Sequence, residues 1–274
     1  MNAPSNSLNA FGTLVISGGS SGIGNKFIRL FLKHSPTARV FNLSRTKPDF
    51  SDGIYNVDHL TVDFTDRAAL DAACADLVNR LEAVPGPVLL VNNSGFGSFG
   101  VFNGADVERD GHMIDVNVRA PMVLTGRLWD VLKQRGGMVV NIASTAAYQP
   151  TPFFATYGAS KAFLAHWSLA LWRENLGTGI HVLTVCPGPT STSFFRNAGF
   201  SERPNVGRGM GPERVARMVL EAVRHKKVLL VCGFRNRVIA AFAGVLPKVW
   251  VTRLEHWLVK SFNLERFKHR KESA

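Results

Sequence analysis

The most informative side chains in the sequence are a phenol and an ammonium group four residues apart. Tyr157 and Lys161 share one face of a helix, because residues at this spacing are neighbours on a helix surface. A nearby positive charge favours the phenolate, so Lys161 is expected to lower the pKa of Tyr157 from about 10. Such a phenol can exchange a proton with a carbonyl or hydroxyl oxygen. The pair therefore predicts acid–base chemistry at a carbon–oxygen bond.

A glycine-rich segment far upstream supplies a second chemical feature. It follows a short β-branched run at residues 13–16 and precedes apolar residues at helical spacing. The segment reads Ser17-Gly18-Gly19-Ser20-Ser21-Gly22-Ile23-Gly24. Glycines let main-chain N–H groups approach a pyrophosphate, and the amino end of the helix adds partial positive charge. A strand, this turn and a helix predict a dinucleotide site, which together with the tyrosine–lysine pair indicates hydride transfer.

The rest of the chain alternates between predicted strands and helices. The strands are predicted at 13–16, 40–43, 59–62, 88–91, 138–142, 181–185 and 228–231, and helices at 66–84, 106–135, 154–176 and 212–225. This order predicts an α/β fold with a seven-stranded, parallel, doubly wound sheet of the Rossmann type. With 274 residues, 46% of them apolar, the chain can bury one large core. We expect one catalytic domain over residues 1–233 and a helical extension over 234–274.

Five motifs in this order resemble those of the short-chain dehydrogenase/reductase family, from about Gly12 to about Gly233. The glycine turn is similar to the family's TGxxxGIG motif, with a serine in place of the threonine. The family's NNAG motif is matched with serine for alanine by Asn93, Ser94 and Gly95 and the asparagine before them. The catalytic tetrad is matched by Asn117, Ser144, Tyr157 and Lys161, and the PG motif with its nicotinamide-contacting threonine by Pro187, Gly188 and Thr190.

The resemblance implies a role for each of these side chains. Tyr157 would exchange a proton with the substrate oxygen while Ser144 hydrogen-bonds that oxygen. Lys161 would lower the pKa of Tyr157 and bind the nicotinamide ribose. Asn117 would support a water that links Lys161 to solvent, and Thr190 would hold the carboxamide. The implied activity is that of an oxidoreductase.

The end of the second predicted strand bears on the choice of cofactor. Folds that use NAD place an acid there for the ribose 2′-hydroxyl, whereas this chain has Ser44 and Arg45. Arg45 can pair with a 2′-phosphate and Ser44 can donate a hydrogen bond to it. The sequence therefore predicts NADP (NADPH). Asp63, followed by Phe64, matches the acid that contacts the adenine in the family.

Aromatic residues occupy three segments that border the catalytic face of this fold. They are Phe96 and Phe99, Tyr148 and Phe154, and Phe194 and Phe195. Any one of them could instead pack in the core, but together they predict an apolar mouth. The substrate expected is a small lipophilic molecule, a ketone or secondary alcohol with an acyl chain, a steroid-like ring or an aromatic group.

Nearly all of the net charge of +12 lies near the carboxyl terminus. Residues 1–202 hold 16 lysines and arginines against 15 acids, whereas residues 203–274 hold 16 against 5. In the same region apolar residues recur at helical spacing and include Trp250 and Trp257. This pattern fits a lid or subunit interface, a peripheral contact with a membrane surface, or a site for an acidic carrier protein or acyl-CoA. Nucleic acid is not expected, because no binding motif accompanies the charge.

Several classes of protein are disfavoured by the remaining features. Three unspaced cysteines (Cys74, Cys186 and Cys232) are expected to be reduced core residues, and the eight histidines form no cluster, so no metal is expected. The amino terminus has no signal-peptide pattern, and no apolar stretch is long enough for a bilayer. We expect a cytoplasmic homo-oligomer, dimer or tetramer, with peripheral attachment to a membrane as the open alternative.

Two other functions fit the same scaffold. One is an epimerase or dehydratase, and the other is an NADP-binding sensor or scaffold whose site is idle. The complete set of Asn117, Ser144, Tyr157 and Lys161 argues against an idle site. Net consumption of NADPH would separate a reductase from an epimerase or dehydratase.

Overall fold

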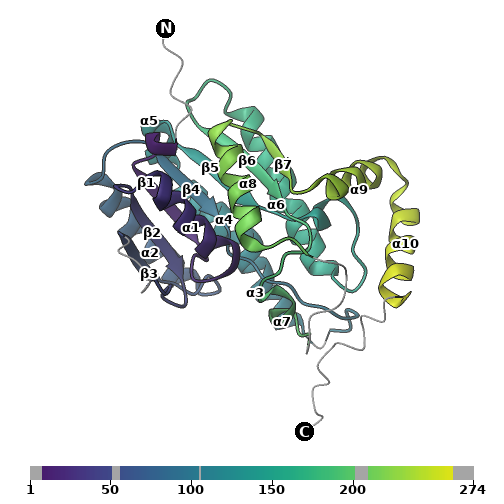
Figure 1. The fold of residues 1–274 in the computed structure, drawn as a ribbon. Helices are drawn as coiled ribbons and strands as arrows, with labels where there is room; N and C mark the ends of the chain where they lie inside the picture. Colours follow the sequence, from purple (N-terminus) through teal and green to yellow (C-terminus); the bar gives the residue numbers. More distant parts are fainter. Residues whose placement is uncertain (1–7, 51–55, 105, 201–208, 262–274) are drawn as a thin grey trace.

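A sheet of seven parallel strands forms the centre of the structure, a computed structural model that describes residues 8–50, 56–104, 106–200 and 209–261 (Figure 1). The strands lie in the order β3-β2-β1-β4-β5-β6-β7. Their bounds are β1 Thr13–Ser17, β2 Arg39–Ser44, β3 Val57–Thr61, β4 Val88–Asn92, β5 Met138–Ile142, β6 His181–Cys186 and β7 Leu229–Val231. The order reverses between β1 and β4, as in a doubly wound sheet. The predicted fold class is confirmed.

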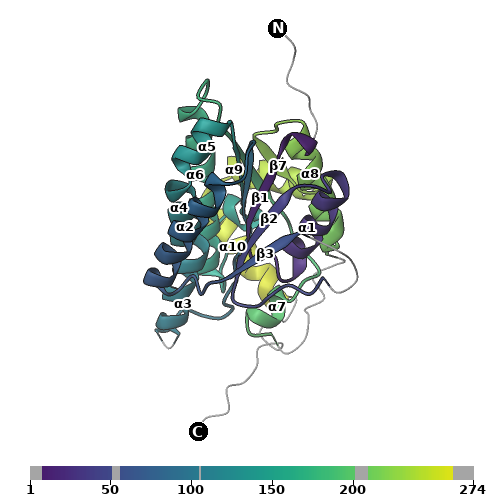
Figure 2. The same ribbon diagram turned by 90° about the vertical axis from the view of Figure 1, so that its left-hand side faces the viewer.

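Helices cover both faces of the sheet, which explains why the central strands β1, β4 and β5 are buried along their whole length. On one side lie α1 (Gly22–His34) and α8 (Pro212–Arg224); on the other lie α2 (Arg67–Glu82), α4 (Ala120–Arg127), α5 (Trp129–Arg135) and α6 (Ala155–Glu174) (Figure 2). Each layer has its own core cluster. Phe27, Ile28 and Phe31 of α1 pack in one, and Leu70, Leu77 and Leu81 of α2 pack in the other. All three cysteines are buried, as expected.

One predicted helix, over residues 106–135, is helical over nearly its whole length but is divided into several elements. The structure has α3 (Val107–Ile114), a π-helical turn η2 (Asp115–Arg119), α4 and α5. The turn contains Asn117, whose buried amide bonds to the backbone of Phe96, a long-range contact that local propensity does not reveal. The break before α5 falls at Leu128, which leaves helical geometry (φ −93°, ψ 1°) with its side chain fully buried. The other predicted boundaries agree within two residues.

Short elements and the carboxyl-terminal helices complete the structure. They are the 3-10 turns η1 (Leu8–Ala10) and η3 (Thr145–Tyr148), α7 (Phe194–Asn197), α9 (Phe234–Val245) and α10 (Lys248–Ser261). The last two extend beyond the β7 edge of the sheet (Figure 1). The helices expected from the apolar spacing near the carboxyl terminus are therefore confirmed, while residues 262–274 of the predicted extension lie outside the described residues. None of the described helices combines the length and apolarity needed to cross a membrane.

Candidate active site

A cleft of about 1180 Å³ lies at the carboxyl ends of the strands, where the predicted motifs converge. This edge of a doubly wound sheet, at the point where the strand order reverses, is where such folds bind their ligands. Nearly all of the predicted cofactor residues line it: Gly18, Ser20, Ser21, Gly22, Ile23, Ser44, Arg45, Asp63, Phe64, Asn93, Ser94, Gly95, Tyr157, Lys161, Pro187, Gly188 and Thr190. Ser17 and Gly24 lie behind this surface and support it.

The glycine turn approaches the cleft too closely for most side chains. A Cβ atom on Gly24 would lie 2.4 Å from the carbonyl oxygen of Gly18, and Gly18 itself has a φ of +71°. The Ser17 hydroxyl accepts hydrogen bonds from the main-chain N–H groups of Asn93 and Ser94, each at 3.0 Å, and so fixes the turn to the loop after β4. The amino end of α1 opens onto the cleft. This cradle fits a pyrophosphate, because N–H groups and the helix dipole favour an anion there.

The end of β2 presents one cation to the cleft. The Arg45 side chain is 76% exposed, and its Nη1 lies 3.9 Å from Oδ2 of Asp63. Burial opposes the charge on Asp63, but hydrogen bonds from Thr65 and the charge of Arg45 hold the pKa of this carboxyl below its ordinary value. The Ser44 hydroxyl donates instead to the carbonyl of Thr46 at 2.9 Å. In the protein alone the Ser44 hydroxyl is thus already engaged, so its hydrogen bond to a phosphate stays a prediction, and the exposed Arg45 guanidinium is the cation that faces the cleft.

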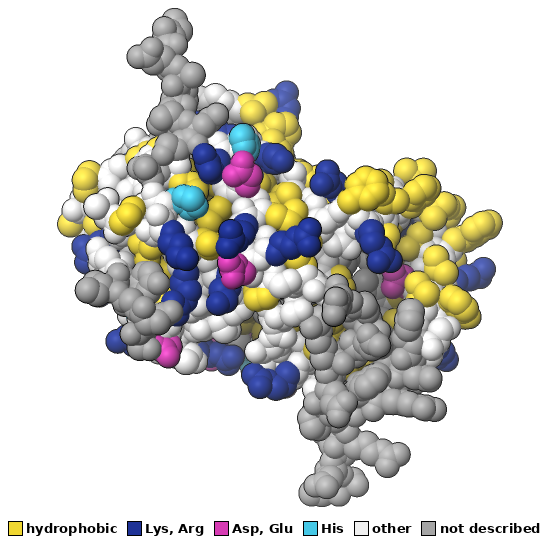
Figure 3. Space-filling view, viewed as in Figure 1, with side chains coloured by type: hydrophobic (Ala, Val, Ile, Leu, Met, Phe, Trp, Pro, Cys, Tyr) yellow, Lys and Arg dark blue, Asp and Glu magenta, His cyan; other side chains and the backbone are white. Residues whose placement is uncertain are grey.

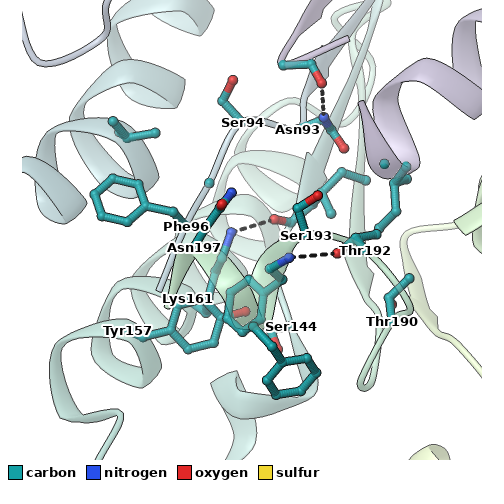
Figure 4. Close-up of a pocket in the computed structure, with 18 of the residues that line it drawn as sticks. Asn93, Ser94, Phe96, Ser144, Tyr157, Lys161, Thr190, Thr192, Ser193 and Asn197 are labelled. Carbon is teal, nitrogen blue, oxygen red and sulfur yellow. Dashed lines mark hydrogen bonds between the residues drawn. The ribbon is translucent and has the colours of Figure 1, made fainter. Parts of the chain in front are cut away.

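Ser144, Tyr157 and Lys161 meet at the centre of the cleft (Figure 4). Ser144 lies just beyond β5, and its hydroxyl hydrogen-bonds that of Tyr157. Lys161 follows one turn later on α6 and is only 4% exposed, and its Nζ donates to the carbonyl of Ile142 at 3.0 Å. The ammonium nitrogen lies 5.9 Å from the centroid of the Tyr157 ring.

The expected lowering of the Tyr157 pKa is not found. Burial raises it to about 12, although the hydrogen bond from Ser144 acts in the opposite direction. The rings of Phe154 and Phe194, whose centroids lie 6.0 and 5.0 Å away, flank the phenol and reduce its contact with water, although Tyr157 still lines the cleft. The same desolvation lowers the pKa of Lys161 to about 8. In the protein alone, burial therefore outweighs the effect of the hydrogen bond from Ser144 on the Tyr157 pKa.

Asn117 is fully buried and does not line the cleft. Its amide nitrogen donates to the carbonyl of Phe96 at 2.9 Å and to the Ser160 hydroxyl at 3.0 Å, while its oxygen accepts from the Phe96 N–H at 3.1 Å. A Cβ on Gly95 would lie 3.0 Å from both Asn117 Oδ1 and Lys161 Nζ, so only glycine allows this approach without displacement. Asn117 thus joins the loop after β4 to α6 beside Lys161.

The loop after β6 closes the cleft opposite the glycine turn. Thr190 donates its hydroxyl proton to the carbonyl of Gly188 at 2.9 Å, and the Pro187 carbonyl accepts from the Thr145 N–H at 2.9 Å. A Cβ on Gly188 would lie 2.3 Å from Nδ2 of Asn236 on α9. Helix α9 therefore packs directly behind the loop that is expected to face the nicotinamide.

Four of the six aromatic residues predicted for the substrate pocket line the cleft: Phe96, Phe154, Phe194 and Phe195. The other two do not, and their assignment is corrected. Phe99 is buried behind the wall, with its ring centroid 4.5 Å from that of Phe200. The Tyr148 hydroxyl bonds instead to the thiol of Cys186.

Several residues that line the cleft were not identified from the sequence. They include Arg109, Phe200, Glu255 and Val259. The Arg109 guanidinium lies 5.7 Å from the Phe96 ring centroid and donates to the carbonyl of Asn197. Glu255 reaches the cleft from α10 and accepts a hydrogen bond from Gln149, and burial raises the pKa of its carboxyl. Glu255 and Val259 belong to α10, which only the tertiary structure brings to the site. Phe200 belongs to the same aromatic run as Phe194 and Phe195, and this run is the signal that could have identified it.

Comparison with known proteins agrees with this geometry. The family model described as short chain dehydrogenase matches residues 12–202. The chain belongs to the short-chain dehydrogenase family. It is thus an oxidoreductase by family, with the Rossmann-type fold. The matched region ends before α8, β7 and the terminal helices, short of the Gly233 limit expected from the motifs.

Individual relatives resemble the chain over nearly its whole length. The ketoacyl reductase HetN from a Nostoc species is 27% identical, with 94% of this chain and 93% of that protein covered. A short-chain dehydrogenase from Sphingobium yanoikuyae, solved with NADPH, has a TM-score of 0.73 at 24% identity and covers 96% of this chain and 98% of its own. A 3-ketoacyl-(acyl-carrier-protein) reductase from Brucella melitensis, solved with NADH, has a TM-score of 0.70 at 23% identity and covers 82% and 98%.

The buried amino group of Lys161 predicts an unusual dependence of stability on pH. Its folded pKa of about 8 is below the ordinary value of 10.5, so the unfolded chain binds this proton more tightly between these values. This group should therefore add about 2 kcal/mol to the free energy of unfolding between pH 8 and 9.5. The raised pKa values of the buried thiols of Cys74, Cys186 and Cys232 act in the opposite direction, but they do so in wild type and variant alike. Compared with the wild type, Lys161→Met should therefore rise less or fall more in stability over this interval, which urea unfolding at both pH values would measure.

The exposed Lys133 provides the matched control. Lys133→Met should keep the pH dependence of the wild type. The interval stops below pH 10, because the raised pKa of Tyr157 adds a further opposing contribution above that value. Equal pH slopes for wild type and Lys161→Met would contradict the assigned cost of burying the ammonium.

Proposed function

We propose that the protein is an NADPH-dependent oxidoreductase that interconverts a lipophilic ketone and a secondary alcohol. The observation that carries the proposal is the meeting of Ser144, Tyr157 and Lys161 between two chemically different ends of one cleft. One end has the glycine cradle and Arg45, which suit a dinucleotide with a 2′-phosphate. The other end is lined by phenylalanines, which suit an apolar substrate.

The side chains at the centre of the cleft have different roles toward the substrate oxygen. Ser144 and Tyr157, already hydrogen-bonded to each other, would both bond the carbonyl oxygen and stabilise negative charge that develops on it. Tyr157 would then transfer its proton to that oxygen, or remove the proton from the alcohol in the reverse direction. The chemistry that NADPH supplies when bound is a hydride for the carbonyl carbon.

Lys161 and Asn117 would prepare the tyrosine for this exchange. The Nζ of Lys161 has one hydrogen bond, to the Ile142 carbonyl, and an ammonium group has two further protons with which to bind a ribose hydroxyl. Asn117 holds the backbone of Phe96 beside it and so fixes the loop after β4. Since burial raises the Tyr157 pKa, this residue keeps its proton at neutral pH and has it available for transfer to the substrate oxygen.

The substrate class follows from the wall of the cleft. Phe96, Phe154, Phe194 and Phe195 are joined there by Phe200 and Val259. Burial of apolar surface against such a wall contributes roughly 25 cal/mol per Å² and favours acyl or ring substituents beside the carbonyl. The similarity to a ketoacyl reductase over nearly the whole chain supports a ketone with an acyl chain.

Tyr157→Phe should lower turnover by roughly 10²–10⁴-fold, because it removes the transferable proton and keeps the ring. Binding of NADPH should change little. Loss of cofactor absorbance with a panel of lipophilic ketones would measure turnover, with the alcohol product quantified in parallel. Alcohol formed in step with NADPH consumed would separate a reductase from an epimerase or dehydratase.

Tyr148→Phe is the matched control, since this hydroxyl bonds Cys186 outside the cleft. It should keep near-normal turnover. The proposal fails if Tyr157→Phe turns over like the wild type, or if no ketone or alcohol exchanges hydride with the cofactor.

Arg45→Ala should weaken NADPH much more than NADH, since only NADPH has the 2′-phosphate. A charge-assisted hydrogen bond contributes about 1.5–3 kcal/mol, which is roughly a ten- to hundredfold change in affinity. Titration calorimetry with both cofactors would measure the ratio. Lys47→Ala, another exposed cation two residues away, is the control and should leave the ratio unchanged. Equal loss for both cofactors would place the phosphate contact elsewhere.

A further inference from the structure

The outer side of α9 and α10 exposes an unusual amount of apolar surface. We call the exposed side chains of these two helices the α9–α10 face. Its large hydrophobic members, with their exposed fractions, are Phe234 76%, Val238 38%, Ile239 53%, Phe242 64%, Val245 86%, Leu246 44%, Val249 61%, Trp250 69%, Leu254 53% and Trp257 62%. Figure 3 shows hydrophobic side chains gathered over this part of the molecule. Contiguous apolar surface of this kind usually marks an interaction site.

The inner sides of the same helices are less apolar than the outer sides. Helix α9 buries only Ala240 and Ala243, and α10 buries Val251 and Val259. Between these two valines, Glu255 points inward and accepts a hydrogen bond from Gln149. A surface helix of a water-soluble domain shows the reverse arrangement, with its bulky apolar residues against the core. The bulky residues of α9 and α10 are thus placed for contact with something outside this chain.

The charges around these residues have a single sign. Arg235, Arg237, Lys248, Arg253 and Lys260 are all exposed. Between residues 234 and 261 the sequence has one acid, Glu255, and that side chain faces the cleft. A second copy of the chain docked face to face would therefore bring like charges together, whereas a negatively charged surface would complement them.

We propose that the α9–α10 face binds peripherally to an anionic membrane surface. Two exposed tryptophans among aliphatic side chains suit the boundary between lipid headgroups and acyl chains, where the indole ring is apolar and its N–H is hydrogen-bonded. The basic residues suit phosphate headgroups. Such helices lie in the plane of the membrane with the apolar side buried by about 5–10 Å.

The position of α10 relates this face to the cleft. The outer side of α10 contributes Trp250, Leu254 and Trp257 to the face, while its inner side contributes Glu255 and Val259 to the cleft wall. One helix, about 10–12 Å across with its side chains, thus separates the membrane from the cleft. A substrate dissolved in lipid would travel only that distance to reach the cleft. This route for the substrate rests on the proposed function, whereas the proposal of membrane binding is independent of it.

The test is co-sedimentation of the full chain with vesicles. We expect binding to vesicles of phosphatidylcholine with one third phosphatidylglycerol at low salt, partial release at high salt, and poor binding to pure phosphatidylcholine. The double variant Trp250→Gln/Trp257→Gln should lower the partition coefficient by roughly tenfold or more, because it removes most of the aromatic burial. Arg237→Glu/Arg253→Glu should abolish the preference for the anionic lipid.

Matched controls lie outside the face. Leu176→Gln changes an apolar residue that is 53% exposed, and Lys133→Glu reverses an exposed charge on α5. Both should bind vesicles like the wild type, and thermal unfolding would verify that every variant is folded. A blue shift of tryptophan fluorescence with anionic vesicles, lost in the double tryptophan variant, would locate the contact.

Three results would overturn the proposal. The first is no salt-sensitive binding to anionic vesicles by the wild type. The second is equal vesicle binding by the face variants and the controls. The third is that the wild type does not bind vesicles but binds polyglutamate, or forms a dimer in analytical ultracentrifugation that only the face variants lose. The third result would assign the face to an acidic protein or to a second copy.

Discussion

The amino group of Lys161 is buried where β5, the loop after β4 and helix α6 meet, and the geometry of the site depends on this burial. Its Nζ bonds the Ile142 carbonyl, and Gly95 approaches so closely that a side chain there would displace either Lys161 or Asn117. The π turn brings Asn117 to the same point, where its amide holds both backbone groups of Phe96. Lys161 and Asn117 together thus join segments that are far apart in the sequence.

The two ends of the cleft differ in how far their side chains are exposed to water. At one end Arg45 and the ionised Asp63 remain exposed to water, where a charged group can be exchanged at little cost. At the other end phenylalanine rings flank Tyr157, and desolvation of the phenol raises its pKa. Helices α9 and α10 complete the wall at this end, since Asn236 packs on Gly188 and Glu255 and Val259 line the cleft.

Local sequence patterns predicted the sheet, the glycine turn and the pairing of Tyr157 with Lys161, because each depends on short-range spacing. These patterns gave wrong predictions where contacts between segments distant in the sequence determine the conformation or the direction of a side chain. The π turn forms through contacts of Asn117 with Phe96 and Ser160, and the amino acids adjacent to Asn117 carry no sign of them. Phe99 and Tyr148 lie on the correct loops, but their direction depends on partners at Phe200 and Cys186. The pKa shift of Tyr157 was predicted with the wrong sign, because a spacing of four residues reveals the charge and not the desolvation.

The balance between burial and charge at Tyr157 is the central claim, and its titration tests that claim most directly. The chain has three tyrosines, so ring-carbon labelling and NMR, assigned with Tyr→Phe variants, would resolve each one. The account predicts that Tyr157 in the free protein keeps its proton well above pH 10, with a pKa near 12, and that the positive nicotinamide of NADP⁺ lowers this pKa more than NADPH does. A Tyr157 pKa at or below 10 in the free protein would mean that the charge of Lys161 outweighs desolvation and would contradict the account.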